Sequence, residues 1–293
     1  MKTCNEDKIL HALLKLVPVT EDEPLGPGDD CAAIRSPEKG LLTLLKTDCV
    51  AEGVHFLRNH DPARVGWKAL CRPLSDIAAM GGIPGQALIN FFSPPDLDPS
   101  YWKKFYRGLG KAAKKFGVTI AGGEMSRQLT GIAVSVMVTG TVSKKNLLTR
   151  SGGRPGDLLF VTGSLGGSLQ GHHLDFQPRL AEGQWLAEKI HPSAMMDISD
   201  GLGADLPRLA RASGCGFEVD AIPCNKGCGL ESALSDGEDY ELLFAVAPKK
   251  TKRLMREWAK AFPKVPLTCI GRLTDTQNAP MDWPGGWDHF GKC

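Results

Sequence analysis

The residues best suited to chemistry in this chain are acidic residues that stand beside Gly or Ser at the ends of short apolar runs. One adjacent Asp pair is typical of a turn or a helix cap, but the pattern recurs. It occurs at Gly28-Asp29-Asp30, Thr47-Asp48, Leu74-Ser75-Asp76, Gly122-Gly123-Glu124 and Asp197-Ile198-Ser199-Asp200. Carboxylate oxygens are ligands that Mg²⁺ prefers, often together with substrate phosphates. The pattern therefore indicates a site where several Mg²⁺ ions hold a polyphosphate.

Such a set of acids favours phosphoryl transfer. Carboxylates held close together repel one another and raise their pKa values as a coupled set, unless cations neutralise them. Phosphoryl transfer needs little beyond in-line placement and charge neutralisation. The chain has no Gly-x-x-x-x-Gly-Lys-Ser/Thr loop, no Gly-x-Gly-x-x-Gly after a strand and no His-Glu-x-x-His. A nucleotide must therefore be bound by other means.

The composition argues against binding to a large anionic partner through overall charge. The 293 residues carry a formal net charge of +2, which predicts no broad attraction to nucleic acid or to an anionic membrane. The nine cysteines form no framework, and no apolar run approaches the ~18 residues of a membrane span. We expect a reduced, cytoplasmic protein. Cys224 and Cys228, with Cys215 upstream, are weakly spaced for zinc and are more typical of buried or incidental thiols.

Two α/β domains, 1–146 and 147–293, are predicted, because a stretch rich in Gly and Ser at 143–156 separates two series of strands and helices. In the second series, Asp200 is expected to cap a helix. The elements expected there are strands at 157–162, 194–198, 217–222, 239–247 and 267–271, and helices at 180–190, 202–213 and 250–262.

In the first domain, strands predicted at 31–34 and 41–45 place Asp30 and Asp48 at the same end of a hairpin. Asp30 precedes one strand and Asp48 follows the other. The hairpin is thus expected to bring these two acids together.

Two further segments of the first domain position acids. Pro73 interrupts a helical pattern, so Asp76 is expected on the first turn of a kinked continuation or of a second short helix, where it can also act as a cap. A strand at 118–121 is followed by Gly122-Gly123, whose backbone can approach a phosphate closely or form a plain turn. Both segments carry their acids next to small residues.

Six motifs, taken together and in order, resemble those of the thiamine-monophosphate kinase family. They are Gly28-Asp29-Asp30, Thr47-Asp48 through Glu52-Gly53-Val54-His55-Phe56, Leu74 to Gly81, Thr149-Arg150-Ser151-Gly152, Asp197 to Leu202, and Ser235 to Leu242. The resemblance implies ATP-dependent phosphorylation of thiamine monophosphate to the diphosphate. It also implies the fold of aminoimidazole ribonucleotide synthetase, with N-terminal domains that pair into a barrel across a homodimer.

The resemblance also implies residue roles, although no single side chain is assigned as catalytic. The implied Mg²⁺ ligands are Asp30, Thr47, Asp48, Asp76, Glu124, Asp197 and Asp200. The implied ATP contacts are Gly123, Glu124, Arg150 and Ser199. The residues implied to line the thiamine monophosphate site are His55, Glu238 and Trp287. An aromatic face suits a cationic thiazolium, but Trp287 can instead seal the core.

Three features depart from the family pattern. Glu124 stands where the family has Asp, which lengthens the side chain by one methylene. Lys46 stands where the family usually has Ser or Thr, and its ammonium is expected to replace part of the charge of one Mg²⁺ ion, so we predict fewer bound metals. Residues 171–194 are fewer than expected, which predicts a trimmed helix over the second domain.

Other interpretations are open at this stage. The C-terminal Cys293 resembles that of a hydrogenase maturation protein that dehydrates a carbamoyl group, whereas Trp287 to Phe290 fits the thiamine enzyme better. Selenophosphate synthetase would need a reactive N-terminal Cys with a nearby Lys, a setting that Cys4 lacks. An enzyme of purine biosynthesis, or a nucleotide-binding protein without transfer activity, are further alternatives.

Overall fold

The computed structural model describes residues 6–19, 25–276, 280 and 283–289, and the chain divides into two compact units. We call residues 30–147 and 171–189 the N-terminal unit, and residues 1–29, 148–170 and 190–293 the C-terminal unit. Each unit contains a five-stranded sheet with helices, so the mixed α/β fold in two parts is confirmed. Of the helices described, none combines the length and the apolar character needed to cross a membrane.

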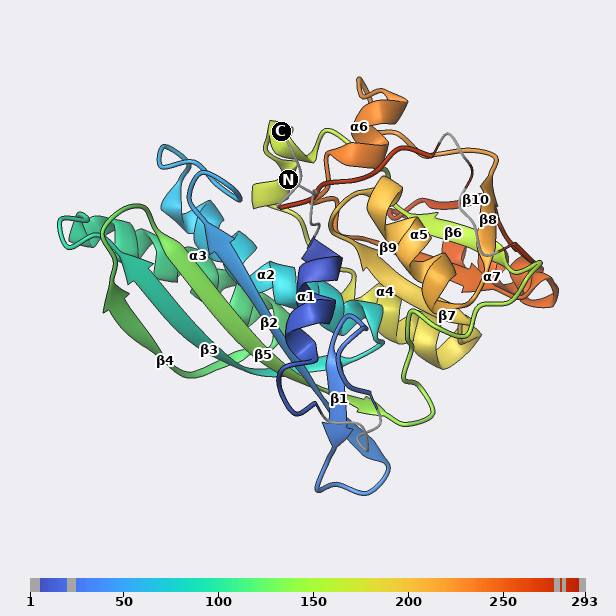
Figure 1. Ribbon diagram of the computed structural model, residues 1–293, viewed down its shortest axis with the longest axis horizontal. Helices are drawn as coiled ribbons and strands as arrows, with labels where there is room; N and C mark the ends of the chain where they lie inside the picture. Colours follow the sequence, from blue (N-terminus) through green and yellow to red (C-terminus); the bar gives the residue numbers. More distant parts are fainter. Residues whose placement is uncertain (1–5, 20–24, 277–279, 281–282, 290–293) are drawn as a thin grey trace. The chain divides into compact units, whose positions relative to one another are not determined.

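The N-terminal unit is a sheet with two long helices packed on one face (Figure 1). Its strands, in spatial order, are β1 (Ala32–Arg35), β2 (Leu41–Ala51), β5 (Ala133–Ser143), β3 (Ile83–Ser93) and β4 (Thr119–Arg127). Neighbouring strands are antiparallel except for the parallel pair β3 and β4. The helices are α2 (Pro62–Ala79) and α3 (Pro99–Phe116), joined in this unit by η2 (His172–Leu174) and α4 (Leu180–Trp185). Both long helices begin with Pro after an Asp whose carboxylate accepts a backbone hydrogen bond.

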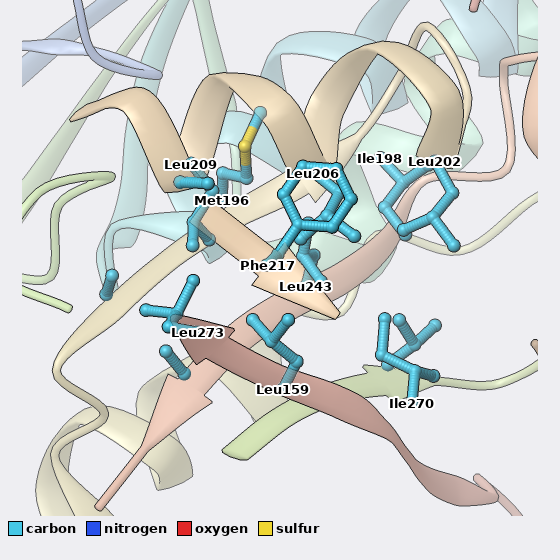
Figure 2. Close-up of a cluster of buried hydrophobic side chains, with 14 of the residues drawn as sticks. Leu159, Met196, Ile198, Leu202, Leu206, Leu209, Phe217, Leu243, Ile270 and Leu273 are labelled. Carbon is cyan, nitrogen blue, oxygen red and sulfur yellow. The ribbon is translucent and has the colours of Figure 1, made fainter. Parts of the chain in front are cut away.

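The C-terminal unit is a second, fully antiparallel sheet. Its strand order is β7 (Ala194–Ile198), β9 (Glu241–Val246), β6 (Leu158–Thr162), β10 (Leu267–Thr274) and β8 (Gly216–Val219). Its helices are α1 (Glu6–Leu14), α5 (Leu202–Ala212), α6 (Leu230–Ser235) and α7 (Pro248–Ala261), with the short turn η1 (Ser168–Gln170). The short helix η3 (Leu186–Ile190) belongs to the N-terminal unit except for its last residue. Figure 2 shows Met196 and Ile198 of β7 packed with Leu206 of α5. Because side chains alternate along a strand, Asp197 lies on the opposite face of β7.

Three expectations about local structure are corrected. β2 extends to Ala51, so Asp48 lies within the strand and not after it. α2 runs through Pro73 without a break, because most of its residues are buried and packing outweighs the lost hydrogen bond; Asp76 is therefore in its last turn and caps nothing. Gly122 and Gly123 are part of β4, which pairs with β3 through this segment, and do not form a loop.

The sequence predicted that the segment 171–194 forms a trimmed helix over the second domain. Its residues 171–189 belong instead to the N-terminal unit, where α4 packs against α2. Gly183 shows how close this packing is, because a Cβ at this position would meet the carbonyl oxygen of Ala78 at 2.1 Å. The segment therefore supports the helix that carries Asp76.

α2 and α3 approach each other through two glycines. A Cβ at Gly66 would meet the carbonyl oxygen of Phe105 at 2.0 Å, and a Cβ at Gly108 would meet that of Ala63 at 1.7 Å. Neither helix can take a side chain there without moving its neighbour. The position of α2 over the sheet thus depends on the absence of side chains at these two glycines.

Gly108→Ala should lower the free energy of unfolding by about 1–3 kcal/mol, because the added methyl overpacks the helix crossing. Gly110→Ala is the matched control on the same helix, since nothing lies within 4 Å of a Cβ there. The control should be neutral or stabilising by up to about 1 kcal/mol, because Ala is the better helix former. Urea unfolding of both variants measures the difference, and equal midpoints would contradict the close crossing.

Candidate functional site

Asp30 and Asp76 form a buried acidic pair in the N-terminal unit. Asp30 precedes β1 and is 2% exposed, and Asp76 of α2 is 6% exposed. A carboxylate oxygen of one lies within 4.8 Å of a carboxylate oxygen of the other. Two negative charges this close repel each other strongly where water does not screen them. A cation beside the pair would offset this repulsion.

The alternation of β2 turns Lys46 and Asp48 toward the helices and Thr47 away from them. The buried residues of this strand are even-numbered, so its even face lies against α2. Thr47 is exposed on the other face, where its Oγ1 lies 3.4 Å from Oγ of Ser135. The side-chain oxygen of Thr47, expected as a neutral ligand, therefore lies on the opposite face of β2 from Lys46 and Asp48.

Lys46 supplies a cation to this acidic group. Its Nζ donates a 2.6 Å hydrogen bond to Oδ1 of Asp76 and lies 3.9 Å from Oδ1 of Asp48. Burial and then the charge of Asp76, with smaller effects of Asp30 and Asp48, raise the pKa of the adjacent Cys31 thiol, and Lys46 opposes this. Three carboxylates thus act on this thiol together with one ammonium, although burial is the largest cause of the shift. Several hard carboxylate oxygens together are a donor set that fits Mg²⁺.

His55 follows β2 and is held by a buried lysine that the sequence did not single out. Nδ1 of His55 accepts a 3.0 Å hydrogen bond from the N–H of Ala51, so a neutral ring carries its proton on Nε2. Lys68 of α2 is fully buried, and its Nζ donates to the carbonyl oxygen of His55 at 2.6 Å and lies 2.8 Å from Nδ1 of His173. Arg64 and Arg72 lie four positions before and after Lys68, on the same face of α2, and three basic residues on one face are typical of a solvent-exposed face. The sequence therefore contains no indication that Lys68 is buried.

Gly123 and Glu124 lie on β4, at the far edge of the sheet from β1. Gly123 has a local reason to be glycine, since a Cβ there would meet the carbonyl oxygen of Ile89 at 1.9 Å. The strand registers place Asp48 level with Gly123, with β5 and β3 between them. Three strand spacings of roughly 4.8 Å separate the two backbones by ~14 Å. Within one chain, Glu124 is therefore not brought to the acids of β2 and α2.

The turn between β7 and α5 is held by Asp205, which the sequence did not single out. Its Oδ2 accepts hydrogen bonds from the N–H of Ser199 at 3.0 Å and of Asp200 at 2.9 Å. Burial, followed by the charge of Asp200, raises the pKa of Asp205 to about 7, and Arg208 opposes this. An Asp in the first turn of a helix that follows Asp-Gly is the sequence signal for this role.

Asp197 and Asp200, at the same turn, have different surroundings. Asp197 is 2% exposed on β7. Asp200 does not cap α5, which begins after Gly201 without a side-chain cap. Its Oδ2 accepts a 2.5 Å hydrogen bond from Nη1 of Arg208, which also contacts Oδ1 of Asp205 at 2.8 Å. Arg208 thus partly neutralises this acidic turn.

Glu238 lies in a strained loop next to the same turn. Glu238 and Tyr240 have φ values of 56° and 53°, which non-glycine residues rarely adopt. Backbone hydrogen bonds hold them, from Glu238 to the carbonyl oxygen of Ser199 at 2.7 Å and from Tyr240 to that of Ile198 at 2.8 Å. Strain maintained by its surroundings is often found at functional sites.

Arg150 lines a basic pocket of about 570 Å³ in the C-terminal unit. Its N–H donates to the carboxylate of Asp29 at 3.1 Å, and its carbonyl oxygen accepts from Ser213 at 3.1 Å. The other residues at this pocket include four of basic type on α1 and α5, and the full lining is Lys8, His11, Gly28, Arg150, Arg208, Arg211 and Ala212. A pocket lined by so many cationic groups is suited to an anion such as a phosphate chain.

Trp287 is 44% exposed and lines a smaller pocket of about 220 Å³ beside α5. Its backbone N–H donates to the carbonyl oxygen of Asp200 at 2.8 Å. The core of this region is instead packed by Trp283, whose Nε1 donates to Gly203 and whose ring meets Phe217 edge to face. The core-sealing alternative therefore does not describe Trp287. Phe290 and Cys293 lie outside the described residues, as does Cys4.

The three cysteines considered for zinc are not gathered. In the part of the chain that the structure describes, no group of metal-ligand side chains contains Cys215, Cys224 or Cys228. Cys215 is buried and its Sγ contacts the carbonyl oxygen of Gly153. These thiols are therefore treated as structural or incidental.

Both halves of the chain match one protein family. Residues 28–142 match the AIR synthase related protein, N-terminal domain, and residues 154–283 match the AIR synthase related protein, C-terminal domain. The thiamine-monophosphate kinase of Aquifex aeolicus is 36% identical over 299 residues, covering 90% of this chain and 92% of that protein. That of Escherichia coli K12 is 34% identical over 310 residues, covering 92% and 93%.

Solved structures give the same relationship. AaThiL complexed with AMPPCP and TMP superposes with a TM-score of 0.84 at 31% identity, covering 99% of this chain and 98% of that one. The two-part α/β fold of this family, expected from the sequence, is thereby confirmed, whereas the barrel across a homodimer stays a prediction. Hydrogenase maturation protein HypE in complex with ATP has a TM-score of 0.69 at 18% identity, and this likeness concerns the fold alone.

Asp239, next to the strained loop, leads to a prediction about pH. Its Oδ1 accepts a 2.9 Å hydrogen bond from Gly166, and its buried Oδ2 has no hydrogen-bond partner among the described residues. Burial raises the pKa of Asp239 from 3.8 to about 8. Between about pH 4 and pH 8 the folded chain thus keeps a proton on Asp239 that the unfolded chain releases. The contribution of Asp239 to the free energy of unfolding therefore falls as pH rises through this range.

Asp239→Asn should therefore gain stability relative to the native chain across this range, by at most about 1.4 kcal/mol per pH unit, because the amide needs no proton. Denaturant unfolding at several pH values, without divalent ions, measures the difference. Asp220→Asn is the exposed control and should show no comparable trend. A difference between Asp239→Asn and the native chain that does not change with pH would contradict the protonated carboxyl.

Proposed function

We propose, because the chain belongs to the thiamine-monophosphate kinase family of AIR synthase related proteins, that it transfers a phosphoryl group from ATP to thiamine monophosphate and forms thiamine diphosphate. The observation that carries the proposal is the match over nearly the whole chain to AaThiL complexed with AMPPCP, an ATP analogue, and TMP. The buried acids of the N-terminal unit and the basic pocket of the C-terminal unit are the chemistry that such a reaction uses.

The proposed Mg²⁺ ligands have hard oxygen donors in both units. They are Asp30, Asp48 and Asp76 in the N-terminal unit, and Asp197 and Asp200 in the C-terminal unit. Bound Mg²⁺ supplies the positive charge that offsets the negative charge of the phosphates. The chain's own part is to fix these carboxylates before substrate arrives, through α2 packing in one unit and through the hydrogen bonds of Asp205 in the other.

The two substrates are proposed to contact different kinds of side chain, cationic for ATP and aromatic or acidic for thiamine monophosphate. Arg150, with the basic pocket around it, suits the phosphates of ATP, and Ser199 and Gly123 are proposed as further ATP contacts. The exposed ring of Trp287 and the carboxylate of Glu238 suit the cationic thiazolium of thiamine. His55 is proposed to line the same substrate.

We also propose a cytoplasmic homodimer with domains at 1–146 and 147–293. β4 supports a dimer, since all nine of its residues are exposed and its outer edge has no strand partner in the described chain. Exposed apolar side chains lie along it, including Met125 at 56%. An edge of this kind invites pairing with a second copy. A role for Glu124, which lies three strands away from Asp48 of its own chain, is consistent with such an assembly.

Purified protein with ATP and Mg²⁺ should release ADP only when thiamine monophosphate is present, with thiamine diphosphate as the second product. Coupled ADP detection and chromatography of the products measure both. ATP hydrolysis independent of thiamine monophosphate would instead favour a related enzyme of the same fold. Binding of ATP without any turnover would favour a nucleotide-binding protein.

Asp48→Asn should lower kcat by at least about 100-fold while leaving the fold intact, because it removes a charged Mg²⁺ ligand from a half-exposed strand position. The matched control is Asp275→Asn, an exposed aspartate of the other unit, which should keep native turnover. Far-UV circular dichroism checks that both variants fold. Native activity in Asp48→Asn would contradict the proposed role of Asp48 as a Mg²⁺ ligand.

Met125→Asp should convert the dimer to a monomer in sedimentation velocity, because it places a charge at the centre of the exposed β4 edge. Met255→Asp serves as control, since Met255 is similarly exposed on α7 in the C-terminal unit. The control should sediment like the native protein. A native protein that sediments as a monomer would contradict the proposed assembly.

A further inference from the structure

We infer that Lys46 is a built-in cation of the acidic group Asp30, Asp48 and Asp76, and that its ammonium takes a place that a divalent ion would otherwise fill. The inference rests on the proposed Mg²⁺-dependent function and deepens it. It concerns how many ions the site holds and how strongly the protein depends on their concentration.

The first argument is the position of the ammonium. Nζ of Lys46 lies 2.6 Å from Oδ1 of Asp76 on α2 and 3.9 Å from Oδ1 of Asp48 on its own strand. It therefore lies between carboxylates contributed by two different elements. An Mg²⁺ ion that bridged those carboxylates would bind their oxygens at about 2.1 Å. The same oxygen lone pairs cannot serve both cations at once.

The second argument is that the chain holds the ammonium in place. The odd and even faces of β2 differ, and Lys46 and Asp48 share the face that meets α2. α2 in turn is fixed by the glycine crossing with α3 at Gly66 and Gly108. Folding thus places the ammonium of Lys46 beside the acids, whereas a metal ion must bind there from solution.

The third argument is electrostatic. A positive charge in contact with Asp76 disfavours a second cation at the same oxygens, and the effect is large because both side chains are mostly shielded from solvent. The group still has more carboxylates than cations, because Asp30, Asp48 and Asp76 are matched by the one ammonium of Lys46. Lys46 therefore removes one ion from the site without removing the site's affinity for the others.

A purely structural role for Lys46, as a tie between β2 and α2, predicts a different result. In that case its loss weakens the fold but leaves the number of bound ions unchanged. The two roles are separated by counting ions in folded variants.

The test is Mn²⁺ binding to the full chain without nucleotide, with free Mn²⁺ measured by electron paramagnetic resonance. Lys46→Met keeps the apolar stem and removes the charge, and Lys46→Gln keeps a polar contact to Asp76 in case the first variant does not fold. Each should bind one Mn²⁺ more per chain than the native protein. Lys46→Arg keeps the charge and should bind the native number.

Lys103→Met is the control for a change in net charge, because Lys103 is an exposed lysine on α3 of the same unit. It should bind the native number of ions. Folded Lys46→Met or Lys46→Gln protein with an unchanged Mn²⁺ number would overturn the inference. Because the measurement uses neither ATP nor thiamine monophosphate, it stands whether or not the proposed kinase activity is found.

Discussion

Carboxylates that lie together in a poorly solvated place must be matched by positive charge, and this constraint governs the candidate site. Asp30 and Asp76 are buried and close to each other in the N-terminal unit. Neither could be kept there as an isolated ionised group without a large free-energy cost. Lys46 offsets part of this negative charge, and the negative charge that remains favours binding of a divalent cation.

The rigidity of α2 makes this arrangement possible. α2 carries Asp76 in its last turn and Lys68 in its middle, so it reaches both the acidic group and the loop of His55. It is held by a glycine crossing with α3 on one side and by α4 on another. Close backbone packing of this kind leaves a helix little freedom to shift, which is what preorganised carboxylates require.

The C-terminal unit handles its acids differently. Asp200 and Asp205 share Arg208, and the carboxylate of Asp205 is used to accept two backbone hydrogen bonds of the turn after β7. The adjoining loop holds Glu238 in a strained conformation through the carbonyl oxygen of Ser199. Hydrogen bonds within the turn thus do for this unit what helix packing does for the other.

The sequence by itself determined the family, the alternation of strands and helices, and the places where acids meet small residues. These properties are local, because side-chain periodicity and motif spacing are written within a few positions of each residue. Within that frame, the strand 194–198 and the helix 250–262 agree closely with β7 and α7.

Only the tertiary structure decided which of those acids meet. It carried α2 through Pro73, extended β2 past Asp48 and buried Lys68, because packing against distant elements outweighs local propensity. It also turned Thr47 to the far face of the sheet and left Glu124 three strands away from Asp48. Register and layer order are properties of pairing between remote segments, and no local pattern in a single sequence specifies them.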